Sequence, residues 1–226
     1  MQIGIIGLGK MGFNLALNLQ RNGYDVVAQD VNTDFVTKIG LEGITTAHSV
    51  KELCQKLNDR KVIWLMVPAG EIVDGVITSL IPFLEKNDII IDGGNSNYKD
   101  SKRRYSQLKE LGIDFLDCGT SGGTSGALNG ACTMIGGDAP VFEYVAQVFK
   151  DISVENGYLY TGAAGSGHFT KMVHNGIEYG MMQSIAEGFE VFEHSEFDID
   201  FKKTAKLFNH GSVVRSWLME LTENAF

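Results

Sequence analysis

Short runs of apolar, β-branched residues alternate with amphipathic stretches along the first half of the chain. Strands are expected at residues 2–6, 24–29, 62–67, 88–91 and 113–116, and helices at 10–22, 33–39, 50–57, 71–80 and 96–111. Parallel strands need a crossover connection, which is usually a helix, so this alternation predicts a parallel sheet covered by helices.

The pattern changes after residue 116. A Gly/Ser/Thr-rich segment at 119–130 is expected to be a loop, and the remaining elements are a strand at 131–135, a helix from Asp138 to about 149, a strand at 157–160, and helices at 166–193, 200–209 and from 213 on. The sequence therefore predicts two domains: an α/β domain at 1–165 and an all-helical part at 166–226.

Composition excludes several classes of protein. The 226 residues are 44% apolar, and 28 acidic against 19 basic residues leave a net charge of −9. An acidic chain does not attract nucleic-acid backbones, so no nucleic-acid partner is expected. The basic run Lys102-Arg103-Arg104 is interpreted as a solvated helix face.

Cysteine spacing and hydropathy indicate the compartment. Cys54, Cys118 and Cys132 are widely spaced and lack partners at metal-ligand spacing, so neither a disulfide framework nor a metal site is expected. The chain shows no basic leader before an apolar run and no apolar stretch of about 20 residues. We expect a soluble, cytoplasmic protein without a membrane partner.

A dinucleotide-binding motif follows the first expected strand. Residues 7–12, GLGKMG, fit G-x-G-x-x-G and open a helix within a βαβ unit. Gly7 permits a tight turn, Gly9 lets a pyrophosphate approach the backbone, and Gly12 lets the helix pack on the strand. The helix N-terminus supplies N–H groups and a positive dipole for the anion.

Asp30 ends the second expected strand, 23 residues after Gly7. A carboxylate at this point can accept both ribose hydroxyls of adenosine and repels a 2′-phosphate. Val31 and Asn32 follow, and no arginine stands beside them, so NAD is predicted over NADP. The alternative is an ordinary glycine turn with a helix-capping aspartate.

The helix expected at 166–193 carries a polar stripe. Lys171, His174, Asn175 and Glu178 fall at i, i+3, i+4 and i+7 and so share one helix face. The stripe combines a potential base, an acid and neutral donors, whereas a solvated face repeats Glu/Lys pairs. A buried lysine can lose its proton near neutral pH and exchange protons with a nearby glutamate. A solvent-exposed polar face remains the alternative.

Glycine is unusually frequent in the same helix. Gly176, Gly180 and Gly188 each cost about 1 kcal/mol relative to alanine, which indicates close approach by another group. Two further segments could bind a ligand: the loop from Cys118 to Gly126, with hydroxyls and backbone N–H groups, and residues 92–96 at the carboxyl end of a strand. A mobile surface connection is the alternative for the loop.

With these elements in place, the sequence resembles the decarboxylating 6-phosphogluconate dehydrogenases, within the β-hydroxyacid dehydrogenase group. The resemblance covers essentially the whole chain, and its marks are residues 4–19, 91–101, 119–137 and 167–188. The Asp30-Val31-Asn32 segment and Pro68 resemble the short, NAD-preferring bacterial branch. The resemblance implies a Rossmann-type doubly wound, mostly parallel sheet followed by the first part of an all-helical domain that serves substrate binding and dimerisation.

The family's site residues can be placed on this sequence. The resemblance makes Lys171 the general base for the C3 hydroxyl and Glu178 the acid that protonates C1 of an enediol. Other positions implied by the resemblance are Ser121, Gly122 and Gly123 for the substrate carboxylate, Asn95, His174 and Asn175 for sugar hydroxyls, Tyr179 and Arg215 for the phosphate, and Gly7, Leu8, Gly9, Lys10, Met11, Gly12, Asp30, Val67 and Asn95 for the cofactor.

The resemblance implies 6-phosphogluconate as substrate, NAD as cofactor, no metal, and a homodimer or higher homo-oligomer. Two other functions are kept open. One is a dehydrogenase for an unphosphorylated β-hydroxyacid, and the other is an NAD-binding chain without catalysis, because the family's helical domain extends well beyond the length that ends at Phe226.

Overall fold

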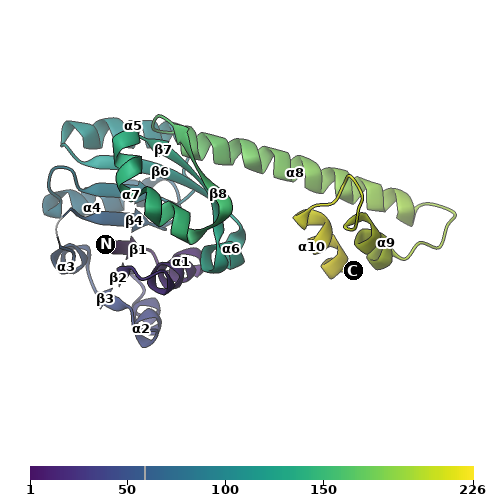
Figure 1. The fold of residues 1–226 in the computed structure, drawn as a ribbon, viewed down its shortest axis with the longest axis horizontal. Helices are drawn as coiled ribbons and strands as arrows, with labels where there is room; N and C mark the ends of the chain where they lie inside the picture. The colour runs from purple at the N-terminus through teal and green to yellow at the C-terminus, as the bar shows by residue number, and fades with distance from the viewer. Residues whose placement is uncertain (59) are drawn as a thin grey trace. The chain divides into compact units, whose positions relative to one another are not determined.

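The structure is a computed structural model that describes residues 1–58 and 60–226 (Figure 1). The chain divides into two compact units, Met1–Met172 and Val173–Phe226. The first unit contains a β-sheet with helices on its faces, and the second is helical. The fold class predicted from the sequence is confirmed.

The strands of the first unit form one sheet in the described residues. They are β1 (Gln2–Ile6), β2 (Asp25–Gln29), β3 (Thr45–Ala47), β4 (Val62–Leu65), β5 (Ile89–Asp92), β6 (Asp114–Ser121), β7 (Ala131–Gly137) and β8 (Ser153–Gly162). Their order across the sheet is β3-β2-β1-β4-β5-β6-β7-β8. All neighbours are parallel except β6 and β7, which are antiparallel.

Helices connect the strands and cover both faces of the sheet (Figure 1). They are α1 (Lys10–Arg21), α2 (Thr33–Leu41), α3 (Val50–Lys56), α4 (Glu71–Leu80), α5 (Tyr98–Glu110), α6 (Gly123–Asn129) and α7 (Ala139–Ile152). The strand order reverses direction between β1 and β4. In open α/β sheets, ligands bind at the carboxyl ends of the strands beside such a reversal.

Alternating residues of the buried strands pack on opposite faces of the sheet. In β5, Ile89 and Ile91 belong to the core on one face, together with Trp64 and Phe149. Ile90 belongs to the core on the other face, together with Leu53. Because side chains alternate along a strand and both faces are covered, these strands are apolar throughout.

The segment at 119–130, predicted as a loop, is instead mostly regular structure. β6 continues to Ser121 because it pairs with β7, with Cys118 opposite Ile135 and Ser121 opposite Cys132. Gly122, at φ +117°, is the N-cap residue of α6, which begins at Gly123. The low helix propensity of Gly, Ser and Thr concealed this helix, which gains its stability from packing against α1. The short strand β3 was also missed.

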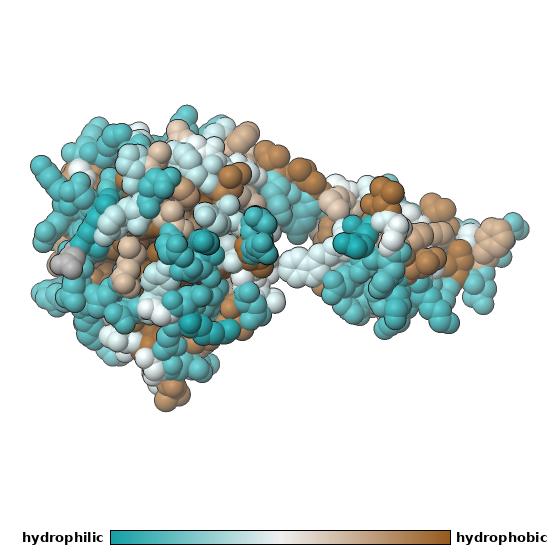
Figure 2. All heavy atoms as spheres, in the orientation of Figure 1, coloured by the Kyte–Doolittle hydropathy of each residue, from teal (hydrophilic) through white to brown (hydrophobic). Residues whose placement is uncertain are grey.

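The second unit contains most of α8 (Ser166–Glu193) together with α9 (Phe201–Phe208) and α10 (Trp217–Ala225). Phe189, Ala205 and Met219 form its small buried core. Figure 2 shows apolar side chains on the surface of this unit, and Trp217 and Phe226 are among the exposed ones. Within residues 1–58 and 60–226, no helix has both the length and the apolar character needed to cross a membrane.

Candidate functional site at the carboxyl ends of the strands

The turn between β1 and α1 has the geometry that its glycines predict. Gly7 has φ +97°, and its N–H donates to Gln29 O at 2.9 Å. A Cβ at Gly7 would lie 2.5 Å from Met66 O, and one at Gly12 would overlap Gly7 O. A Cβ at Gly9, in contrast, would meet no atom of the described chain within 4 Å. The backbone at Gly9 is therefore open to a ligand.

Asp30 lies directly after β2 and faces this turn. Its Oδ2 accepts the Leu8 N–H at 2.5 Å, and its Oδ1 accepts the Asn32 N–H at 2.7 Å. Asp30 therefore holds the glycine turn in place. Each carboxylate oxygen retains a lone pair, so the carboxylate can still accept hydroxyl groups of a ligand.

Val67 lies between the glycine turn and the loop that follows β5. A Cβ at Gly7 would come 2.9 Å from Val67 Cγ1, and a Cβ at Gly94 would come 2.6 Å from Val67 O. The structure thus brings together three of the predicted segments, those around Gly7, Val67 and Asn95.

Asn95 is held by the neighbouring strand. It adopts φ +53°, a left-handed conformation that asparagine tolerates better than most residues. Its Oδ1 accepts the Thr120 N–H at 3.0 Å, and its Nδ2 donates to Thr120 O at 3.3 Å. Thr120 is followed directly by Ser121 and by Gly122, which has a left-handed conformation. Asn95 is therefore fixed to the end of β6, next to the predicted carboxylate-binding residues Ser121, Gly122 and Gly123.

Lys171 is a buried lysine near the start of α8, with 7% of its surface exposed. It packs so closely against β6 that a Cβ at Gly119 would overlap Lys171 Cβ and lie 2.9 Å from Gly167 O. The predicted general base is therefore placed against the same strand as Ser121.

The first turn of α8 is anchored by a buried carboxylate. Asp117 in β6 accepts the Gly165 N–H at 2.6 Å and the His168 N–H at 2.8 Å. Burial raises the pKa of Asp117, against the opposing effects of the nearby His168 and of these N–H groups. The His168 ring is also buried, and its Nδ1 lies 2.7 Å from Ser101 Oγ in α5.

The other stripe residues follow on α8 in the second unit. His174 Nδ1 lies 3.2 Å from Asn175 Oδ1 and 3.6 Å from Glu178 Oε2, so these three side chains form a cluster. Tyr179 is 70% exposed, and Arg215 is an exposed residue of the connection between α9 and α10.

The helix glycines do not have the close contacts predicted for them. A Cβ at Gly176, Gly180 or Gly188 would meet no atom within 4 Å in the described chain. The low helix propensity of these positions is therefore not explained by packing within residues 1–58 and 60–226.

The interpretation of Lys102-Arg103-Arg104 as a solvated face is wrong for its last residue. Arg104 is 1% exposed because α5 turns it toward the sheet, where it meets the buried Asp92. The signal was available: Asp92 ends a strand whose other residues are all isoleucine, and a carboxylate at such a position needs a buried partner. Sequence reasoning missed Arg104, and it also missed Asp117 and His168.

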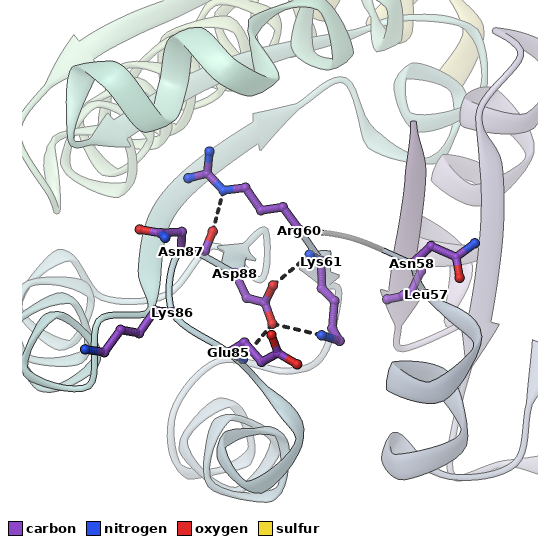
Figure 3. Close-up of a pocket in the computed structure, with 8 residues that line it drawn as sticks. All are labelled: Leu57, Asn58, Arg60, Lys61, Glu85, Lys86, Asn87 and Asp88. Atoms are coloured by element: carbon purple, nitrogen blue, oxygen red, sulfur yellow. Dashed lines mark hydrogen bonds and ion pairs between the residues drawn. The ribbon is translucent and has the colours of Figure 1, made fainter.

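One cavity lies away from these residues. It has a volume of about 540 Å³ and is lined by residues just before β4 and β5, including Lys61 and Asp88 (Figure 3). These are the amino ends of the strands, opposite the glycine turn. Asp88 accepts the N–H groups of Lys61 and Glu85, both at 2.8 Å, and Arg60 is bonded to Asp114. Lys61 and Asp88 form an ion pair here, and the cavity lies at the opposite edge of the sheet from the glycine turn, so it is not the candidate site.

No metal centre is formed by the described residues, since residues 1–58 and 60–226 contain no group of three or more His, Cys, Asp or Glu side chains placed to hold an ion.

Together, the doubly wound sheet, its glycine turn and the buried lysine beside the strand ends define a dinucleotide-binding dehydrogenase with a helical second part. The family model described as the NAD binding domain of 6-phosphogluconate dehydrogenase matches residues 2–162, and the model of the C-terminal domain of 6-phosphogluconate dehydrogenase matches residues 167–226. The chain belongs to the 6-phosphogluconate dehydrogenase family.

Individual relatives agree with this membership. The YqeC protein of Bacillus subtilis is 54% identical over all of this chain and 76% of the relative. The NAD(+)-dependent, decarboxylating 6-phosphogluconate dehydrogenase of Haloferax volcanii is 43% identical over all of this chain and 75% of the relative. The 6-phosphogluconate dehydrogenase structure of Plasmodium falciparum superposes with a TM-score of 0.92 at 34% identity. That match covers 99% of this chain, which spans half the length of the Plasmodium chain.

Proposed function

We propose that the chain acts as an NAD-dependent, decarboxylating 6-phosphogluconate dehydrogenase, which converts 6-phosphogluconate to ribulose 5-phosphate and CO2. Family membership and the name of the Haloferax volcanii relative support the reaction. The observation that carries it is the burial of Lys171 against Gly119, at the strand ends that also hold the glycine turn.

The turn between β1 and α1 fits a dinucleotide. The open backbone at Gly9 and the N-terminus of α1 suit the pyrophosphate, which Gly7, Leu8, Gly9, Lys10, Met11 and Gly12 would hold. Asp30 would accept the adenosine ribose hydroxyls and disfavour the 2′-phosphate of NADP. Val67 and Asn95 would contact the nicotinamide end. When bound, NAD supplies the acceptor for the hydride that leaves C3 of the substrate.

Lys171 acts first as the general base. In its neutral form, the amine of Lys171 takes the proton of the C3 hydroxyl. The product of this oxidation is a 3-keto acid. The protonated Lys171 then polarises the ketone oxygen as the bond between C2 and the carboxylate carbon breaks.

The electrons of that bond form an enediol, with the lysine proton passing to the former ketone oxygen and CO2 leaving. Glu178 then donates a proton to C1, as numbered in the five-carbon product, while the neutral Lys171 takes back the proton of the C2 hydroxyl, and ribulose 5-phosphate results. No metal is needed, because a β-keto acid already has its electron sink.

The remaining predicted residues bind the substrate. Ser121, Gly122 and Gly123 would hold the carboxylate, and Asn95, His174 and Asn175 would bind hydroxyls. Tyr179 and Arg215 would bind the phosphate. In this proposal residues 1–165 bind NAD, and residues 166–226 contribute to substrate binding and to a homodimer or larger homo-oligomer.

The compartment is proposed from the thiols. All three cysteines of the chain are free in the structure, as expected of a reducing compartment such as the cytoplasm.

The direct test is absorbance at 340 nm with 6-phosphogluconate and either NAD or NADP. We expect NADH formation that exceeds NADPH formation. Lys171→Met should lower turnover by about 10²- to 10⁴-fold while NADH binding is retained. Lys150→Met, at an exposed lysine of α7, is the matched control and should keep full turnover.

Two results would favour the other functions. An Arg215→Ala variant with an unchanged Michaelis constant for 6-phosphogluconate would contradict phosphate binding and favour an unphosphorylated β-hydroxyacid. A folded chain that binds NAD but forms no NADH with 6-phosphogluconate or with an unphosphorylated β-hydroxyacid would be a binding protein without catalysis.

A further inference from the structure

Arg104 in the middle of α5 is a buried cation that joins two loops at the carboxyl end of the sheet. Its Nη2 donates to Gly70 O at 2.9 Å, in the loop between β4 and α4. Its Nη1 donates to Asp92 Oδ2 at 3.1 Å and to Ser96 Oγ at 3.0 Å, which bracket the loop between β5 and α5. Its Nε donates to Asp74 Oδ1 at 2.7 Å, in the first turn of α4.

Asp92 shapes the second loop from within. Its Oδ1 accepts the Gly94 N–H at 3.1 Å, and its Oδ2 accepts the Ser96 hydroxyl at 2.8 Å. The carboxylate is fully buried, and its ion pair in the described chain is with Arg104. Asp92 therefore holds the Gly94 backbone and the Ser96 side chain, on either side of Asn95.

The two loops also touch each other directly. A Cβ at Gly93 would overlap Trp64 Nε1 in β4, and a Cβ at Gly94 would lie 2.6 Å from Val67 O. A small change in the spacing of the loops would therefore change the relative position of Val67 and Asn95. These two residues are the ones proposed to contact the nicotinamide end of the cofactor.

We propose that Arg104, through its ion pair with Asp92, is a positioning residue that sets the spacing of the two nicotinamide-binding loops. The inference rests on the proposed NAD binding. It assigns the main effect of Arg104 to the nicotinamide end, because the four bonds of Arg104 lead to the two loops and to Asp74, and not to the glycine turn or Asp30 at the adenosine end.

The arrangement requires arginine in particular. The planar guanidinium supplies donors to four partners at once, whereas a lysine ammonium is a compact charge with three donors and no fork. Arg104→Lys keeps the positive charge beside Asp92 but cannot reproduce the four bonds. Ser96→Ala removes one bond to Arg104 and one to Asp92 and leaves both charges paired.

The experiment compares two ligands: NADH, and ADP-ribose, which lacks the nicotinamide ring. Dissociation constants are measured by calorimetry on the full chain. For Arg104→Lys we expect NADH to bind at least 10-fold more weakly and ADP-ribose to stay within twofold of the wild type. For Ser96→Ala we expect the same selectivity, with a loss of about threefold for NADH.

Arg103→Lys is the matched control. Arg103 also bonds to Asp74, but it lies on the exposed side of α5, and its bonds within residues 1–58 and 60–226 go to Asp74, Asp100 and Gln107, none of which lies in either loop. We expect unchanged affinity for both ligands.

Equal losses of NADH and ADP-ribose affinity in Arg104→Lys would show a general structural role and overturn the inference, and so would unchanged NADH affinity. If Arg104→Lys does not fold, Ser96→Ala decides by the same comparison. A wild-type chain that binds NADH but does not oxidise 6-phosphogluconate contradicts the proposed reaction and leaves this binding test to decide the inference. A wild-type chain that binds neither ligand overturns both.

Discussion

Gly119 faces Lys171 so closely that no side chain fits between β6 and α8 at this point. A Cβ on Gly119 would overlap Lys171 Cβ, and it would also lie 2.9 Å from Gly167 O. Since Gly167 O belongs to the backbone of α8, the helix itself would have to move to make room. The position of the proposed base thus depends on glycine, which has no side chain, at position 119 of the neighbouring strand.

Gly119→Ala should therefore reduce both stability and turnover. We expect a loss of about 1–3 kcal/mol in the free energy of unfolding, from overpacking in a closely packed interior. We also expect a turnover loss of at least 10-fold, because Lys171 is displaced. Urea unfolding and the absorbance assay at 340 nm measure the two effects.

Gly75→Ala is the matched control for this substitution. Gly75 is an exposed residue within α4, and a Cβ there would meet no atom within 4 Å. Alanine should be neutral or stabilise the fold by up to about 1 kcal/mol, with turnover unchanged. A Gly119→Ala variant that behaves like Gly75→Ala would contradict the close packing at Lys171.

The glycine turn was predictable because its requirements are local. A tight turn, an open backbone and a close helix each need glycine at a fixed offset, and Gly7, Gly9 and Gly12 meet them. The buried Arg104 was not predictable from its neighbours, since Lys102 and Arg103 on the same helix are exposed. Its burial depends on Asp92, which lies twelve residues earlier in a different element.

The α6 helix was missed for a related reason. Residues 123–129 have poor intrinsic helix propensity, so the composition indicates a loop. The helix is stabilised by α1, more than a hundred residues earlier, through contacts that only the folded chain provides. Local signals thus predicted the glycine turn well and the long-range supports of the segment at 119–130 poorly.

Asp30→Ala should weaken the preference for NAD over NADP. The substitution removes the carboxylate that would repel a 2′-phosphate, and it also frees the Leu8 N–H from its 2.5 Å bond. We expect the ratio of kcat/KM for NAD to that for NADP to fall at least 10-fold, mainly through KM for NAD. Asp34→Ala, in the first turn of α2, is the control and should leave the ratio unchanged.

Asn18 offers a test of the link between α1 and α6. This buried residue of α1 donates from Nδ2 to Ala127 O at 3.1 Å and to Ile152 O at 3.2 Å. Asn18→Ala leaves both carbonyls without this donor, so we expect a loss of about 1–3 kcal/mol in urea unfolding. Asn14→Ala, at a half-buried residue of the same helix whose bond to Lys10 O is exposed to solvent, should cost less than about 0.5 kcal/mol. Equal effects of the two variants would refute this role of Asn18.

The contribution of Asp74 to stability should depend on pH. Hydrogen bonds from Arg104 and Arg103 hold the pKa of Asp74 below its usual value of 3.8. A carboxylate whose pKa is lower in the folded state stabilises the fold above its unfolded pKa and loses this effect as pH falls through its folded pKa. The contribution should thus be complete above about pH 5 and disappear well below pH 4.

We expect Asp74→Asn to lower the urea midpoint at pH 7 and to approach the wild type as the pH is lowered toward 2. Asp100→Asn, at a weaker 3.4 Å partner of Arg103, should change little across the same range. A difference between Asp74→Asn and the wild type that stays constant with pH would mean that the charge of Asp74 does not stabilise the fold.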